Sequence, residues 1–99
     1  MSALAELQGW YLSQCNGEWE HSHGIHIGTL DNPGWRVRID LRGTDLEARP
    51  FKAISDLDPD VNWMECHVED GHFEAHGGAP MLEPMLRAFL NWASGRAPA

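Results

Sequence analysis

The sequence predicts an α+β fold, in which an antiparallel four- or five-stranded meander sheet carries an N-terminal and a C-terminal helix on one face. Apolar residues recur every three or four positions near both ends of the chain and alternate with polar residues in between. Turn sequences separate the alternating segments. The length of 99 residues matches one compact domain, which we expect to span 1–99.

The first expected element is a helix over residues 3–15. Its apolar positions have helical spacing: Leu4, Leu7, Tyr11 and Cys15, with Trp10 alongside. Ser2 can cap the N-terminus of this helix. Asn16 and Gly17 tolerate a left-handed backbone, so we expect the helix to end there.

The last expected element is a helix within MLEPMLRAFLNWASG. One stripe holds its apolar residues: Leu82, Met85, Leu86, Phe89, Leu90 and Ala93. Pro80 and Pro84 fit only near the first turn, where no intrahelical N–H partner is lost. Gly95 marks the end of the helix.

The segments GIHIGTL and WRVRIDL predict two strands of a hairpin. Their apolar residues alternate along the chain: Ile25, Ile27, Trp35, Val37, Ile39 and Leu41. Pro33 and Gly34 are expected at the centre of a type II turn, because proline fixes a negative φ and glycine accepts a positive one.

A second hairpin is predicted where NWMECHV and HFEAH flank Asp70 and Gly71, a strong sequence for a type I′ turn. Its core side would hold Met64, Cys66, Val68, Phe73 and Ala75. Residues 51–57 can add a short strand, and the SDLDPD run after it is expected to be an acidic loop.

If both helices cover one sheet face, the other face should be open. It would carry His26, Arg36, Arg38, Asp40, Trp63, Glu65, His67, His72, Glu74 and His76. Such a concentration of polar groups suits contact with a partner. It is equally typical of a solvated surface.

The stretch GEWEHSHGIHI first suggests a zinc site that uses His21, His23 and His26 with a carboxylate. The alternation of side chains between the two faces of a strand argues against this site. If the strand begins by His23, that side chain shares a face with Ile25, and His26 points to the opposite face.

An acid/base pair of Glu18 or Glu20 with His21 is the other chemical interpretation of this stretch. The sequence has no nucleophile motif, phosphate-binding glycine loop or cofactor fingerprint beside it, so we do not expect an enzyme or a cofactor. We interpret the stretch as a joint between helix and sheet. Trp19 would pack under the crossing, His21 would hydrogen-bond a loop, and the two glutamates would be free for partner contacts.

Fifteen acidic and seven basic residues give a net charge of −8, which repels nucleic acid and anionic membranes and attracts cationic partners. The sequence has no apolar run near the ~20 residues that span a bilayer and no secretory signal, so a cytoplasmic location is expected. Cys15 and Cys66 are expected to be reduced thiols.

The motifs LQGWYLSQCNGEWEHSHGIHIGTLDNPGWRVRIDL, NWMECHVEDGHF and FLNWA together resemble the bacterial immunity protein 53 family. The resemblance implies a small cytosolic protein that is encoded beside a polymorphic toxin, binds it and blocks it. It carries over no catalytic residues. Asn16 and His23 stand where the family pattern has an aspartate and an aromatic residue. The matching positions are Trp10, Tyr11, Trp19, Glu20, His21, Gly24, Asp31, Asn32, Pro33, Gly34 and Trp35.

We therefore expect an immunity protein that neutralises a cognate toxin domain of basic character by stoichiometric binding, as a monomer or weak homodimer. The alternative is a histidine-rich metal-binding protein or metal-dependent enzyme. Except for Glu20, the positions that match the family pattern are expected to have a structural role. The expected partner-binding residues are Glu18, Glu20, His26, Arg38, Asp40, Asp56, Asp58, Asp60, Trp63, Glu65, His67 and Glu74.

Overall fold

The computed structural model describes residues 2–56 and 62–95. Its elements follow in the order α1 (Ala3–Gln14), α2 (Trp19–Ser22), β1 (Ile25–Leu30), β2 (Gly34–Asp40), β3 (Ile54–Asp56), β4 (Met64–Glu69), β5 (His72–Gly77) and α3 (Leu82–Ala93). The strands form one antiparallel sheet in the order β1-β2-β5-β4-β3. The predicted α+β class and antiparallel sheet are confirmed. In detail, β5 rather than β3 lies beside β2, so the chain crosses over once instead of following a simple meander.

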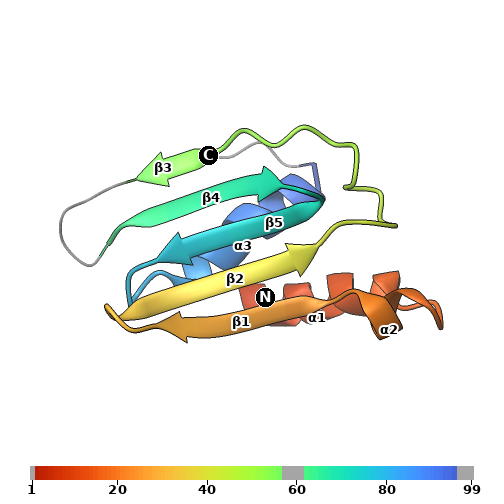
Figure 1. Ribbon diagram of the computed structural model, residues 1–99, viewed down its shortest axis with the longest axis horizontal. Coiled ribbons are helices and arrows are strands. Elements are labelled where there is room, and N and C mark those ends of the chain that lie inside the picture. Colours follow the sequence, from red (N-terminus) through yellow and green to blue (C-terminus); the bar gives the residue numbers. More distant parts are fainter. Residues whose placement is uncertain (1, 57–61, 96–99) are drawn as a thin grey trace.

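The two long helices lie behind the sheet, and the opposite sheet face is open to the viewer in Figure 1. The core fills the space between these two layers. Val37, Ile39 and Phe73 come from the central strands and are fully buried. Phe89 of α3 packs edge-on against Phe73, with ring centroids 5.2 Å apart. The helices therefore bury one sheet face and leave the other for contacts.

Helix α3 confirms the predicted apolar stripe. Met85, Leu86, Phe89 and Leu90 are buried. The guanidinium of Arg49 donates hydrogen bonds to the carbonyl oxygens of Trp92 and Ala93, at 3.0 and 3.2 Å. These bonds satisfy carbonyl groups that have no partner within the last turn of a helix. Gly95 follows with a φ of 76°, as the sequence predicts.

Helix α1 begins as predicted but buries a different stripe. Ser2 accepts a hydrogen bond from the Ala5 N–H at 3.1 Å. Ala3 and Leu7 are buried, whereas Leu4 is 54% exposed and Tyr11 is 37% exposed. The predicted stripe is confirmed at Leu7 and wrong at Leu4 and Tyr11, because apolar residues occur around most of this helix and contact with α3 selects the buried ones. The helix also ends earlier than expected, at Gln14.

The β4–β5 turn is confirmed, since Asp70 and Gly71 have φ values of 52° and 76°. The predicted type II turn at Pro33 and Gly34 is wrong. Leu30 pairs with Gly34, so the loop is residues 31–33, and Gly34 begins β2. A Cβ at Gly34 would collide with the Gly77 carbonyl oxygen. The glycine therefore serves the close approach of β2 and β5.

Strand β3 confirms the predicted short strand. The acidic residues Asp58 and Asp60 lie outside the described residues.

Both cysteines are free thiols, and burial raises the pKa of the Cys66 thiol to about 12. Among the described helices, none has both the length and the apolar character needed to cross a bilayer.

Candidate functional site

The open face is formed by side chains that lie in rows across the strands. One row runs from β1 to β4 through His26, Arg38, Glu74 and His67. The second row contains Arg36, His76 and Glu65, and the third contains Asp40, His72 and Glu69. We call these ten residues the open face. Trp63, which was also expected there, precedes β4 and is half-buried.

Charge is divided across the open face. Arg36 and Arg38 lie on β2 with His26 beside them on β1. Glu65 and Glu69 lie on β4, next to Glu74 on β5. Apart from Asp40 on β2, the acidic residues of the open face therefore lie on the β4–β5 half and its arginines on the β2 half, although the whole chain carries a charge of −8.

Asp40 is a buried carboxylate at the end of β2, with 5% of the residue exposed. Arg42 donates Nε to Oδ1 at 3.2 Å, Nη2 to Oδ2 at 3.1 Å, and its backbone N–H to Oδ1 at 3.0 Å. The Nε2 atoms of His72 and His23 lie 3.6 and 3.9 Å from Oδ2. Asp40 thus organises neighbouring side chains and is itself covered, although it was expected to be a partner contact.

The environment of Asp40 also determines its protonation. Burial alone would raise the pKa of this carboxyl group. The hydrogen bonds from the side chain and backbone of Arg42 outweigh burial, and the positive charges nearby add to their effect. The pKa of Asp40 therefore lies below its ordinary value.

This lowered pKa predicts a loss of stability in acid. A carboxyl group with a lowered folded-state pKa stabilises the fold above its unfolded pKa of about 3.9, and this contribution is lost as pH falls through the lower folded value. We expect the free energy of unfolding to decrease at pH values below about 4. Asp40→Asn should be less stable at pH 7 and show a smaller acid-induced decrease.

Urea unfolding at pH values from 7 to 2.5 measures this difference. Asp31→Asn, at an exposed position in the β1–β2 loop, is the matched control and should retain the wild-type decrease. An Asp40→Asn curve parallel to the wild-type curve would contradict the assigned role of Asp40.

A hollow of about 440 Å³ lies where β1 begins and β2 ends. Its lining includes His21, His23, His26, Arg38, Asp40 and Arg42, with His72 beside them. The expectation that strand parity separates the first three histidines is wrong for His23. Strand β1 begins only at Ile25, and the chain before it places the His23 ring beside Asp40.

The joint between α1 and β1 is built on Trp19, which is 5% exposed. Its Nε1 donates a hydrogen bond to the Arg42 carbonyl oxygen at 2.9 Å, and its ring packs edge-on against Trp10. The ring of His23 stacks on it, with centroids 5.9 Å apart. Trp19 therefore holds the segment after β2 against the joint and supports the hollow.

Glu20 closes the turn between α1 and α2. Its carboxylate accepts hydrogen bonds from the backbone N–H groups of Asn16 at 3.0 Å and Gly17 at 2.8 Å. The hydrogen bond from its own N–H lowers the pKa of Glu20, and those two bonds add to this effect. The carboxylate thus has an internal role as well as its expected place among the partner contacts. Glu18 is exposed.

His21 is exposed and lines the hollow. Its backbone N–H donates to the Glu18 carbonyl oxygen, but within residues 2–56 and 62–95 its side chain makes none of the hydrogen bonds expected of a scaffold residue. Trp35 does have such a bond, from Nε1 to the Ala79 carbonyl oxygen at 2.9 Å.

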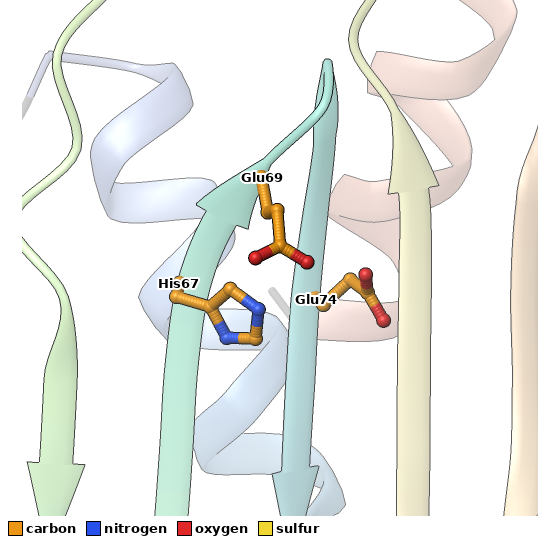
Figure 2. A group of neighbouring side chains, drawn as sticks. All are labelled: His67, Glu69 and Glu74. Carbon is orange, nitrogen blue, oxygen red and sulfur yellow. The ribbon is translucent and has the colours of Figure 1, made fainter.

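A group that could hold a metal ion lies elsewhere on the open face. Figure 2 shows His67 and Glu69 of β4 pointing toward Glu74 of β5. Their ligand atoms all lie within 4.8 Å of one another. An imidazole with two carboxylates can bind zinc, although Arg36 already lies 3.4 Å from a Glu74 oxygen. In the part of the chain that the structure describes, the histidines of the joint form no such group.

Sequence reasoning missed two residues of this region. Arg42 continues the alternation of Arg36, Arg38 and Asp40, and Glu69 continues that of Glu65 and His67. If the alternation of side chains is continued to the next position on the same face, both residues are predicted to belong to this region.

A second concavity of about 810 Å³ lies against α3 and is mainly apolar, with Phe51, Ile54 and Trp92 in its lining.

Comparison with known proteins now identifies the family. The model of the family described as immunity protein 53 matches residues 4–94. The chain belongs to the immunity protein 53 family. Neither a curated protein nor a solved structure matches it. Membership in the immunity protein 53 family confirms the resemblance, supports an immunity function in general and implies a toxin partner. The matched residues include the open face and the hollow.

Proposed function

We propose that this chain binds a cognate bacterial toxin domain stoichiometrically and neutralises it through the open face. The observation that carries the proposal is a sheet face that no described helix covers and that presents ordered rows of charged side chains. A rigid sheet fixes these groups in place, so binding does not require them to be ordered first. Neutralisation requires no catalytic step by the chain.

The overall charge supports a partner of basic character. A charge of −8 attracts a cationic domain over a distance comparable to the Debye length and speeds its association. Glu18 and Asp56 are exposed and suited to this steering role. We propose the same role for Asp58 and Asp60.

Co-expression with the product of the adjacent toxin gene tests this function. We expect the chain to restore growth of cells that express the toxin, to co-purify with it, and to give a 1:1 stoichiometry in calorimetry. Failure of both rescue and complex formation would refute the proposal.

Charge reversal then tests the surface. Glu65→Lys changes an exposed residue of the open face, and we expect it to weaken toxin binding at least about tenfold, because like charges opposed across an interface cost several kcal/mol. Glu83→Lys makes the same change at an exposed position of α3, behind the sheet, and should bind within about threefold of wild type. Equal effects of the two reversals on the dissociation constant would argue against the open face.

A further inference from the structure

We infer that the hollow beside β1 and β2 receives a carboxylate side chain of the bound toxin domain, and that Arg38 is the residue that recognises it. This inference rests on the proposed function and names the chemistry of one contact.

Arg38 differs from the other two arginines of this region. Arg36 pairs with Glu74 at 3.4 Å, and Arg42 pairs with Asp40 at 3.1 Å. Within residues 2–56 and 62–95, the Arg38 side chain forms no ion pair or hydrogen bond, and its buried Nε has no acceptor. Arg38 also lines the hollow, so a partner that places a carboxylate there meets a guanidinium with no competing acceptor and gains affinity.

The acidic side chains nearest to Arg38 are already engaged. Glu74 lies opposite Arg38 in the sheet, but its carboxylate contacts Arg36. Asp40, the carboxylate of the hollow, is bound through both oxygens by Arg42. The hollow therefore keeps an excess of positive charge that its own carboxylate does not neutralise.

The chemistry of the hollow favours a single carboxylate. A guanidinium presents planar, paired N–H groups that match the two oxygens of a carboxylate. A nucleic-acid backbone would bring many negative charges close to Glu69 and Glu74 and to a chain of charge −8. One acidic side chain on an otherwise basic protein surface complements both the hollow and the acidic half of the open face.

The decisive variant is Arg38→Gln in the full chain, compared with Lys52→Gln. Both remove one positive charge, but Lys52 is exposed before β3, outside the open face and outside the lining of the hollow. We expect Arg38→Gln to weaken binding of the toxin domain at least about thirtyfold, as for loss of one partner of a hydrogen-bonded charge pair, and Lys52→Gln to weaken it less than about threefold. Urea unfolding of both variants must show intact folds.

Equal affinities of Arg38→Gln and wild type would overturn the inference and leave the proposed function standing. An equal loss in both variants would also overturn it, because the effect would then be one of general charge. Failure of the wild-type chain to bind the toxin would instead refute the function itself.

A second measurement needs no toxin. The Arg38 Nε–H resonance of the ¹⁵N-labelled chain is followed by NMR during titration with N-acetylglutamate amide, which carries one carboxylate. We expect this resonance to move more than that of Arg36. A change with inorganic phosphate but not with the carboxylate, or no change with either, would contradict the inference.

Discussion

Replacing Phe89 by alanine is expected to lower the free energy of unfolding by about 3–5 kcal/mol. The Phe89 side chain is fully buried. Its ring lies 5.0 Å from that of Trp10 in α1 and 5.2 Å from that of Phe73 in β5, measured between centroids. Removing it leaves a cavity where both long helices meet the sheet, and the ring contacts that join them are lost.

Urea unfolding followed by far-ultraviolet circular dichroism measures this loss. Leu12→Ala is the control, because Leu12 also lies on a helix but is 72% exposed. We expect the control to change the free energy of unfolding by no more than about 0.5 kcal/mol. A small domain has only about 5–15 kcal/mol of stability, so this loss is a large fraction of the total. A loss below about 1 kcal/mol would contradict the assigned core.

Replacing Gly34 by alanine is expected to lower the free energy of unfolding by about 1–3 kcal/mol, as overpacking does. The new methyl group would collide with the carbonyl oxygen of Gly77 in the adjacent strand and approach the side chain of Leu30. Because the obstacle is backbone, β2 and β5 must separate to admit the methyl group. The strain therefore falls on two inner strands of the sheet, where β2 begins and β5 ends.

Gly28→Ala in the same hairpin is the matched control for this substitution. A Cβ at Gly28 meets nothing within 4 Å. Alanine is favoured over glycine within a strand by roughly 0.5–1 kcal/mol, so the control should be as stable as wild type or more stable. Thermal and urea unfolding of the two variants should therefore give opposite signs. Destabilisation by Gly28→Ala as large as that by Gly34→Ala would refute the steric explanation.

Features that depend on neighbouring residues in the sequence were predictable. The apolar stripe of α3 and the turn at Asp70 and Gly71 are encoded by spacing and by backbone preference, and the structure confirms both. The role of Gly34 was not predictable in this way. The need for a residue without a side chain there follows from the approach of the Gly77 carbonyl oxygen, which is far away in the sequence.

The same distinction explains the errors at the candidate site. Alternation along β2 placed Arg38 and Asp40 on the open face correctly. It gave no indication that Arg42 and His72 would cover Asp40, because those contacts depend on how the loop after β2 and strand β5 meet. The path of the backbone between α2 and β1 likewise placed His23 beside Asp40, where parity alone put it on the opposite face.

The division of charge across the open face also restricts how a partner can approach. Arg36 and Arg38 lie on β2, whereas Glu65, Glu69 and Glu74 lie on β4 and β5. The acidic residue of β2, Asp40, is paired with Arg42. A partner with the complementary pattern is attracted in one orientation, whereas a half-turn about the sheet normal places like charges opposite each other. If the toxin binds through the open face as proposed, this pattern favours one orientation of the approaching toxin before the surfaces touch.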